Sequence, residues 1–196
     1  DGLHEAMTYS FISSKAIDTL HLDEKDERRN EIKILNPLGD EYSRMRTQLL
    51  TGMLASLATN YNRKNPSAKL FEVSKIFVPK QMPITEQPAE IPALSIGMYG
   101  DKTDFFTLKG IVEDILGIFG DNFEYEVSSE NYLHPGRQAN AVLDGKIYAT
   151  FGEVHPDVRK EYDLEVRAYV AQVALDKLFE LPEKKKYNDY STGMKM

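Results

Sequence analysis

The sequence predicts an α+β fold in which helices flank a mainly antiparallel sheet. Two observations lead to this prediction. Strand-like segments follow one another through a tight hairpin signal at Asp144-Gly145, and amphipathic helical segments interrupt the series of strands. With 196 residues, 41% of them hydrophobic and 28% charged, the chain is long enough to bury a sizeable core. One main domain is therefore expected.

The first forty residues contain short signals. The mixed charges of the run from Asp23 to Glu31 leave no apolar face, which favours a solvated loop or a frayed helix end over a binding tract. Around this run we expect a strand, a helix capped by Ser13 or Ser14, a second strand and a turn, at Ala6–Ile12, Ser13–Leu20, Ile32–Leu35 and Asn36-Pro37-Leu38-Gly39.

The segment that follows is the most regular in the chain. Apolar residues at helical spacing predict an amphipathic helix from about Thr47 to Arg63, ended by Asn65-Pro66. Leu70 to Val78 is rich in Phe, Val and Ile and predicts a strand. The prolines between Lys80 and Pro92 predict an irregular connection, and Leu94 to Tyr99 is the next expected strand. Such a helix and strand by themselves indicate only core packing.

The second half alternates between helix and strand signals. A helical stripe beginning at Phe105 has Thr103 or Asp104 as its cap and Gly120 as its stop. The later expected elements are a half-buried strand, the two strands of the hairpin, a short helix opened by His155-Pro156 and a buried strand, at Phe123–Val127, Ala139–Leu143, Lys146–Phe151, His155–Tyr162 and Ala168–Ala174.

Composition argues against several classes of function. No apolar run is long enough for a transmembrane helix, so we expect no membrane partner. The chain has no cysteine, and its four histidines lack the spacing of metal ligands, so we predict no metal site; the lack of cysteine is compatible with a cytoplasmic protein. A net charge of -7 argues against a surface devoted to phosphate backbones. The start at Asp1 and the polar stretch from 181 to 196 suggest a domain of residues 1–180 within a longer parent, with 181–196 as a polar tail or a linker toward a missing C-terminal domain.

Several short motifs occur together in a specific order. They are Glu5 with Thr8-Tyr9-Ser10-Phe11, Asn36-Pro37-Leu38-Gly39, Met45-Arg46-Thr47, Leu70-Phe71-Glu72-Val73, Asp104-Phe105-Phe106, Leu133-His134-Pro135-Gly136-Arg137 and Gly152-Glu153-Val154-His155-Pro156. In this order the chain resembles the core domain of the bacterial phenylalanyl-tRNA synthetase beta subunit, from about Gly2 to Leu178. The resemblance implies a class II aminoacyl-tRNA synthetase-like fold.

The chain departs from the ATP signatures of active class II synthetases. Such enzymes have an Arg and an acid at one strand end, where the resemblance places Val78 and Lys80. They also have a GxGxxR motif, which is absent from this sequence. Its best-matching segment has Gln172 and Ala174 at the glycine positions and Lys177 at the Arg position. Val cannot bond phosphate, and a Cβ hinders close approach of a nucleotide to the backbone.

The resemblance therefore implies a noncatalytic core domain. In the family such a domain packs on the catalytic alpha subunit of an α2β2 heterotetramer, a ligase of protein biosynthesis, and supports aminoacylation of tRNA(Phe). ATP and Mg are implied for the whole enzyme, with no cofactor in this domain. The alternative is a degenerate class II fold that still binds an amino acid or a nucleotide as a regulatory or altered-ligase domain. A relic cleft should be filled by side chains, with Phe71, Phe77, Tyr99 and Tyr148 as candidates.

Other family positions have weaker assignments. The segment His134-Pro135-Gly136-Arg137 is a candidate relic ligand loop; the alternative is a turn in which Arg137 pairs with a carboxylate. The resemblance also puts an interface element just before Gly2, so we expect an exposed apolar patch near the N-terminus. We expect Arg46 to brace the turn at Asn36 to Gly39. Architectural roles are assigned to Asn36, Pro37, Arg46, Thr47, Glu72, Glu153 and His155.

Overall fold

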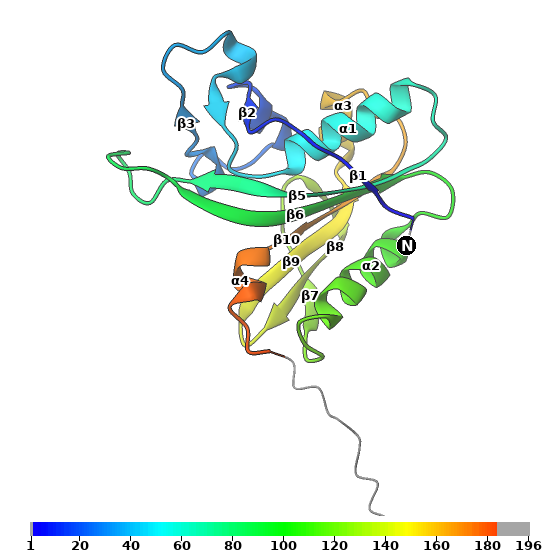
Figure 1. The fold of residues 1–196 in the computed structure, drawn as a ribbon. Helices are drawn as coiled ribbons and strands as arrows, with labels where there is room; N and C mark the ends of the chain where they lie inside the picture. The colour runs from blue at the N-terminus through cyan, green and yellow to red at the C-terminus, as the bar shows by residue number, and fades with distance from the viewer. Residues whose placement is uncertain (1, 184–196) are drawn as a thin grey trace, which may run out of the picture.

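The computed structural model describes residues 2–183 and contains a seven-stranded sheet of order β1-β5-β6-β10-β9-β8-β7 (Figure 1). All neighbours pair antiparallel except β1 and β5, which are parallel. The strands are β1 His4–Glu5, β5 Ala68–Val78, β6 Ala89–Tyr99, β7 Glu124–Val127, β8 Leu133–Leu143, β9 Lys146–Val154 and β10 Ala168–Val173. A second sheet of order β2-β4-β3 consists of β2 Phe11–Ile12, β3 Ile32–Lys33 and β4 Arg44–Met45. This architecture confirms the predicted fold class.

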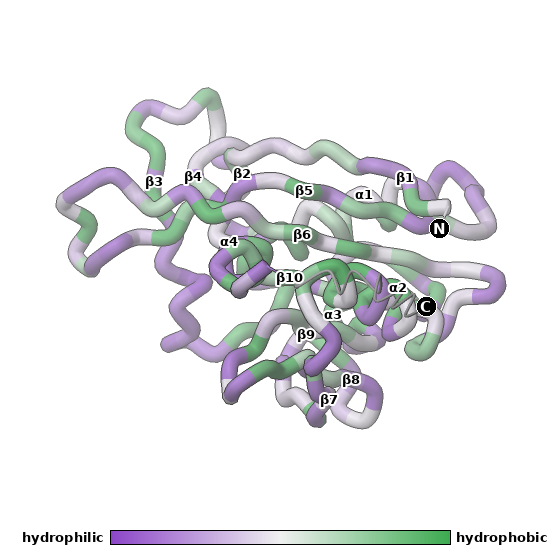
Figure 2. Tube along the Cα trace, turned by 60° about the horizontal axis from the view of Figure 1, so that its bottom comes forward, coloured by the Kyte–Doolittle hydropathy of each residue, from purple (hydrophilic) through white to green (hydrophobic). Residues whose placement is uncertain are grey.

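Helices cover both faces of the large sheet (Figure 1). The α-helices are α1 Leu50–Asn62, α2 Phe105–Gly117, α3 Pro156–Glu161 and α4 Leu175–Phe179, and 3-10 helices form at Ala16–Leu20, Glu27–Arg29 and Asp40–Tyr42. One hydrophobic cluster lies between α1 and the sheet and a second between α2 and the opposite face. Figure 2 shows hydrophilic residues concentrated in the peripheral loops, as expected when the strands supply the core.

Successive side chains of β6 point to opposite faces of the sheet, so this one strand contributes residues to both hydrophobic clusters. Ile96 and Met98 pack in the α2 cluster, whereas Tyr99 packs in the α1 cluster. A Cβ built on Gly97 would lie 2.6 Å from Met53 Cγ of α1. Glycine at this position therefore allows α1 to lie directly on the strand.

The predictions for the second half agree well with the structure. Asp104 caps α2, because its carboxylate accepts the Thr107 amide while the Thr107 hydroxyl accepts the Asp104 amide. This helix ends at Gly117, three residues before the expected stop. Asp144-Gly145 connects β8 to β9, and both strands extend beyond their predicted outer ends. His155 caps α3 by accepting the Asp157 amide.

The first half requires more corrections. The strand expected over Ala6–Ile12 is present only at its last two residues. The expected helix over Ser13–Leu20 is a shorter 3-10 helix, because the Ser13 and Ser14 hydroxyls bond Asp40 and cap no helix. The run expected to be a solvated loop or a frayed helix end contains a short 3-10 helix at Glu27–Arg29, capped by Asp26. The charge pattern of the run did not show that Glu130 and Thr47 hold Arg28 in place.

Two boundaries near the centre also differ from expectation. Helix α1 begins at Leu50, because the Gln48 side chain accepts the Thr51 amide and the Thr47 hydroxyl donates to the carbonyl of Arg28. Strand β6 begins at Ala89, so Pro92 lies within a strand rather than in an irregular connection. Strand β10 pairs with β6 only from Leu94 onward, so one side of β6 is free at Pro92, where proline is tolerated. The expected linker at 181–196 lies almost entirely outside the described residues.

Candidate functional site

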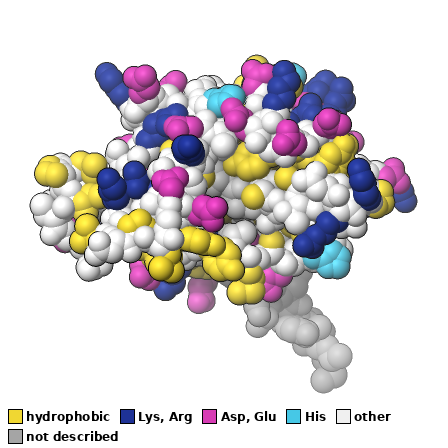
Figure 3. All heavy atoms as spheres, turned by 90° about the horizontal axis from the view of Figure 1, so that it is seen from above, with side chains coloured by type: hydrophobic (Ala, Val, Ile, Leu, Met, Phe, Trp, Pro, Cys, Tyr) yellow, Lys and Arg dark blue, Asp and Glu magenta, His cyan; other side chains and the backbone are white. Residues whose placement is uncertain are grey.

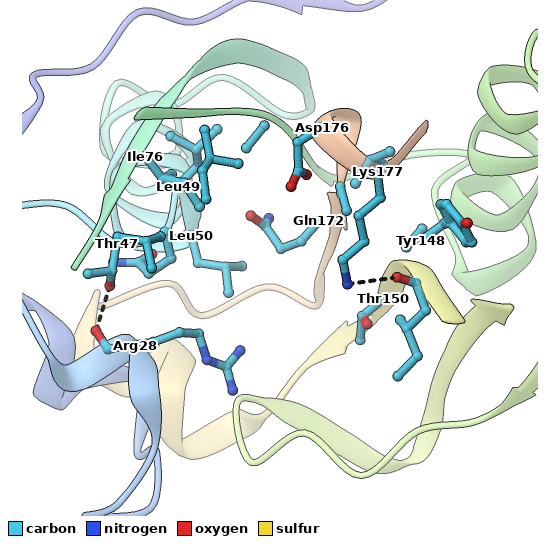
Figure 4. A pocket seen from close by; sticks show the side chains of 18 of the residues that line it. Arg28, Thr47, Leu49, Leu50, Ile76, Tyr148, Thr150, Gln172, Asp176 and Lys177 are labelled. Carbon is cyan, nitrogen blue, oxygen red and sulfur yellow. Dashed lines mark hydrogen bonds between the residues drawn. The ribbon is translucent and has the colours of Figure 1, made fainter. Parts of the chain in front are cut away.

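A cavity of about 520 Å³ opens on the α1 face of the sheet; we call it the sheet cavity (Figure 4). The β5–β6 hairpin forms one wall, and β9 and β10 form the floor and the other wall. The entries to α1 and α4 and the 3-10 turn at Glu27–Arg29 close its ends. Its apolar walls include Leu49, Leu50, Ile76, Val78, Ile91, Pro92, Ala93, Ile147, Tyr148, Ala149 and Val173.

Four of the five predicted degenerate ATP positions meet at this cavity. Val78, Gln172, Ala174 and Lys177 all line it, although they come from two segments almost a hundred residues apart. Lys80 is not among the lining residues; it lies beyond the end of β5 and faces Glu86 at 3.9 Å. The role of these positions as remnants of an ATP site stays a prediction.

A row of polar side chains crosses the sheet beneath the cavity. Because directly paired residues in an antiparallel sheet project to the same face, the strand registers align six polar side chains across six strands. The members of this polar row, from β5 to β7, are Glu72, Ser95, Gln172, Thr150, Asn140 and Glu126. Single polar residues inside apolar strands were the signal in the sequence, but only the register shows that they form one row.

The Glu72 end of the polar row is covered by the chain itself. The Glu72 carboxylate accepts bonds from the Thr8 amide at 2.9 Å, from the Thr8 hydroxyl and from Ser74. Arg46 lies 3.6 Å away and donates to Thr8 Oγ1 and to the carbonyl of Lys75. Both charged side chains are almost fully buried. Burial lowers the pKa of Arg46, although the Glu72 charge opposes that change.

These contacts correct the role expected for Arg46. Its guanidinium bonds the N-terminal segment and β5, and it does not brace the turn at Asn36 to Gly39. That turn is exposed, and Asn36 has a positive φ of 53°. Asn is one of the few residue types that adopt this conformation readily.

The middle of the polar row opens into the sheet cavity. Gln172 Nε2 donates to Ser95 Oγ at 2.7 Å and to the carbonyl of Ala171 at 2.8 Å. Thr150 donates its hydroxyl hydrogen to Asn140 Oδ1 at 2.7 Å. Figure 4 shows the Gln172 amide and the Thr150 side chain within the cavity. Hydrogen-bond acceptors therefore remain at its floor.

Charged groups surround the cavity at its ends. Arg28 donates to Asp26 at 2.9 and 2.7 Å and to Glu130 at 2.8 Å. Burial opposes the charge of Arg28, but these two carboxylates outweigh it and raise its pKa; the same contacts lower the pKa of Asp26. Lys177 Nζ lies 3.5 Å from the carbonyl of Ile147. Sequence reasoning missed Arg28, because its partner Glu130 is 102 residues away.

Asp176 also lines the cavity, and it differs from the other charged groups. Figure 4 shows its carboxylate directed toward the interior of the cavity. Within residues 2–183 its side chain has no hydrogen bond or ion pair. Of the four aromatic residues expected to fill the cleft, only Tyr148 is among the residues that line it, and its ring packs against Phe123 in the α2 cluster. Tyr99 packs with the α1 cluster and Phe71 against the α2 cluster, so the expected filling is not found.

The segment His134-Pro135-Gly136-Arg137 lies elsewhere. It belongs to β8, next to a register shift, and so it is no turn. Arg137 donates to both carboxylate oxygens of buried Glu153, at 3.0 and 3.1 Å, as the alternative interpretation proposed. Arg137 and Glu153 line a second hollow beside α2, of about 650 Å³, together with Phe105, Phe106 and Tyr125.

Exposed apolar residues lie near the N-terminus, as expected. Met7 is 89% exposed and Tyr9 77%, and with Phe11 and Tyr42 they line a shallow hollow. We call these four residues the N-terminal apolar surface. Further along the segment, Ile17 and Leu20 are buried in the core. Figure 3 shows groups of hydrophobic side chains between charged ones on the upper face of the molecule.

Two general features of the described residues bear on function. None of the helices between residues 2 and 183 is long and apolar enough to cross a membrane. In the same part of the chain, no three His, Asp or Glu side chains are grouped in a way that could hold a metal ion.

Comparisons with known proteins agree on one family. The model described as "Phenylalanyl tRNA synthetase beta chain CLM domain" matches residues 1–175. The phenylalanine–tRNA ligase beta subunits of Clostridium acetobutylicum and Clostridium tetani are 45% and 39% identical to this chain. Each match covers 91% of the chain, but only 23% and 22% of the relative. The chain thus spans about a quarter of the length of these curated relatives.

A solved structure supports the fold independently. The pyrrolysyl-tRNA synthetase of Desulfitobacterium hafniense superposes with a TM-score of 0.72, covering 91% of this chain and 62% of that one. The two sequences are 11% identical, so this likeness concerns the fold alone. It confirms the predicted class II synthetase-like architecture.

Proposed function

The chain belongs to the phenylalanyl-tRNA synthetase beta chain CLM domain family, and we propose that it is a noncatalytic scaffold domain of a phenylalanine–tRNA ligase. The observation that supports this most is the chemistry of the sheet cavity. Val78 and Ala174 line this cavity, and the resemblance predicts that active class II synthetases carry an arginine and a glycine at these two positions. The domain would keep the fold and leave ATP and Mg to the rest of the enzyme.

The cations near the cavity do not replace the missing phosphate ligands. Arg28 already donates to two carboxylates, and Lys177 is directed at a carbonyl. Asp176 would repel a triphosphate placed in the same space. Adenylate formation needs positive charge fixed at the α-phosphate, and this cavity offers little that is uncommitted.

We further propose that the domain packs on the catalytic alpha subunit of an α2β2 enzyme in the cytoplasm. In this role it would support aminoacylation of tRNA(Phe) without forming the adenylate itself. The N-terminal apolar surface suits such contact, because exposed aromatic and methionine side chains are enriched at protein interfaces.

This proposal is tested by binding of the alpha subunit to the 196-residue chain and its variants. Met7→Ser with Tyr9→Ser should weaken binding at least tenfold in sedimentation or calorimetry. Ile118→Ser with Val127→Ser is the matched control, since these residues are 71% and 83% exposed near α2 and β7. Equal loss in both double variants, or none in the first, would contradict the proposed docking surface.

A second function is favoured by one observation. The sheet cavity is open, whereas a relic cleft was expected to be filled by side chains. This favours a degenerate class II fold that still binds a small ligand, alongside the scaffold role.

A further inference from the structure

The size and walls of the sheet cavity suit a small organic molecule. Its volume of about 520 Å³ lies within the roughly 300–1,000 Å³ typical of ligand sites. Ile76 and Ile91 on the β5–β6 hairpin and Ile147 on β9 give it apolar walls. Such walls favour a ligand with an apolar body.

The floor of the cavity accepts hydrogen bonds. A backbone carbonyl can only accept, so the Gln172 atom beside the carbonyl of Ala171 must be the amide nitrogen. That nitrogen also donates to Ser95, which commits both of its hydrogens and leaves Oε1 as the available atom. The Thr150 hydroxyl hydrogen is committed to Asn140, so its free capacity is likewise that of an acceptor. A ligand group bound at this floor must therefore be a donor.

The charges around the cavity favour a cation. Its lining contains Glu27, Glu130 and Asp176 against Arg28 and Lys177. Arg28 is neutralised by Asp26 and Glu130, and Lys177 Nζ is directed at the carbonyl of Ile147. Asp176 has no partner within the described residues and is directed inward (Figure 4), so with Glu27 the uncommitted charge of the lining remains negative. An ammonium group is both positively charged and a donor of three hydrogen bonds.

We propose that the sheet cavity binds a small primary amine with an apolar body, whose ammonium group is shared by Asp176 and the acceptors of Gln172 and Thr150. The inference rests on the second function proposed above and is independent of the scaffold role. It assigns the cavity to an apolar ammonium compound and excludes a nucleotide.

The test compares two probes of similar shape and opposite charge, phenethylamine and 3-phenylpropionate, titrated into the 196-residue chain with labelled isoleucine methyl groups. The amine should bind saturably and at least tenfold more tightly than the acid. Its addition should shift the resonances of Ile76, Ile91 and Ile147, which line the cavity, and leave that of exposed Ile118 unchanged. No saturable shift with the amine, or equal affinity for both probes, would overturn the proposal.

A matched pair of variants separates the site from general electrostatics. Asp176→Asn should weaken amine binding at least tenfold, whereas Glu180→Gln, which removes the same charge from the exposed end of α4, should change it less than twofold. Unchanged binding by Asp176→Asn would overturn the assignment. If that variant does not fold, the methyl shifts of the wild-type chain still decide the question. If the amine does not bind, or if Asp176→Asn binds it normally, the proposed scaffold role still stands, because that role is tested separately by binding of the alpha subunit.

Discussion

The two parts of the polar row differ in how they are covered. At the β5 end, Glu72 is 1% exposed, accepts hydrogen bonds from Thr8 and Ser74 and forms an ion pair with Arg46, so the chain closes this end with its own N-terminal segment. In the middle, Gln172 and Thr150 face the sheet cavity. One row of polar residues thus contains a closed part that holds the fold and an open part that is free to meet a ligand. Stability should depend strongly on the first part and weakly on the second.

The largest expected effect comes from breaking the closed end. Glu72→Ala would leave Arg46 charged and buried without its partner, which should cost about 3–5 kcal/mol in the free energy of unfolding. Denaturant unfolding measures this loss directly. Glu90→Gln is the control, because Glu90 pairs with Lys75 on the surface and should contribute less than about 1 kcal/mol. Similar losses in the two variants would show that the buried pair of Glu72 and Arg46 contributes no more to stability than a surface ion pair.

Glu31 contrasts with Glu72, whose buried carboxylate is hydrogen-bonded. Glu31 is half-buried, and its Oε2 has no hydrogen-bond partner among the described residues. Burial raises the pKa of Glu31 to about 7 from its ordinary value of 4.5. The folded state therefore keeps a proton that the unfolded chain releases, and stability falls as pH rises from about 4.5 to 7. After allowance for solvent screening, we expect a loss of about 1–2 kcal/mol over this range.

The variant Glu31→Gln should remove this part of the pH dependence. Unfolding free energies measured at pH 5 and pH 8 would then differ less in the variant than in the wild-type chain. An unchanged difference would show that Glu31 does not titrate in this range.

Gly52 tests how tightly the N-terminal segment is held. A Cβ at this position of α1 would lie 2.8 Å from Thr8 Oγ1, which is committed to Glu72 and Arg46. Gly52→Ala should therefore destabilise the chain by about 1 kcal/mol, although alanine favours the helix itself. In contrast, Gly110→Ala in α2 should stabilise by roughly 0.5–1 kcal/mol, since a Cβ there meets no atom within 4 Å. Thermal unfolding compares the stabilities of Gly52→Ala and Gly110→Ala. If both variants are more stable than the wild-type chain, Thr8 must move away from the new methyl group without cost.

A small effect is also expected in the open part of the row. Thr150→Val keeps the shape of the side chain but removes the hydrogen bond to Asn140, at a cost of about 1 kcal/mol. Denaturant midpoints of this variant and of Glu72→Ala can be compared under the same conditions. A loss above about 3 kcal/mol would show that the open part also holds the fold.

Sequence patterns predicted the regular elements well because their signals are local. The stripe and cap of α2, the hairpin at Asp144-Gly145 and the end of β5 at Val78 each depend on a few neighbouring residues. The N-terminal third was harder, because its short elements are held by distant partners, as Ser14 is by Asp40. Its local charge pattern carries no information about those partners.

The candidate site was only partly predictable for the same reason. The resemblance brought out Val78, Gln172, Ala174 and Lys177, which line one cavity. It missed Arg28 and Asp176, whose places depend on tertiary contacts. The polar row required the register of six strands, and strand register is not visible in single-strand patterns.

The central claim is that this domain has kept a class II fold without an ATP site. Calorimetric titration of the 196-residue chain with ATP and Mg²⁺ tests it most directly. We expect no saturable heat up to millimolar ATP, because Val78 and Ala174, the predicted replacements of an arginine and a glycine, cannot hold phosphate, and the carboxylate of Asp176 would repel it. Saturable binding in the micromolar range would contradict the claim, and a phosphate site would then have to be sought beginning at Arg137.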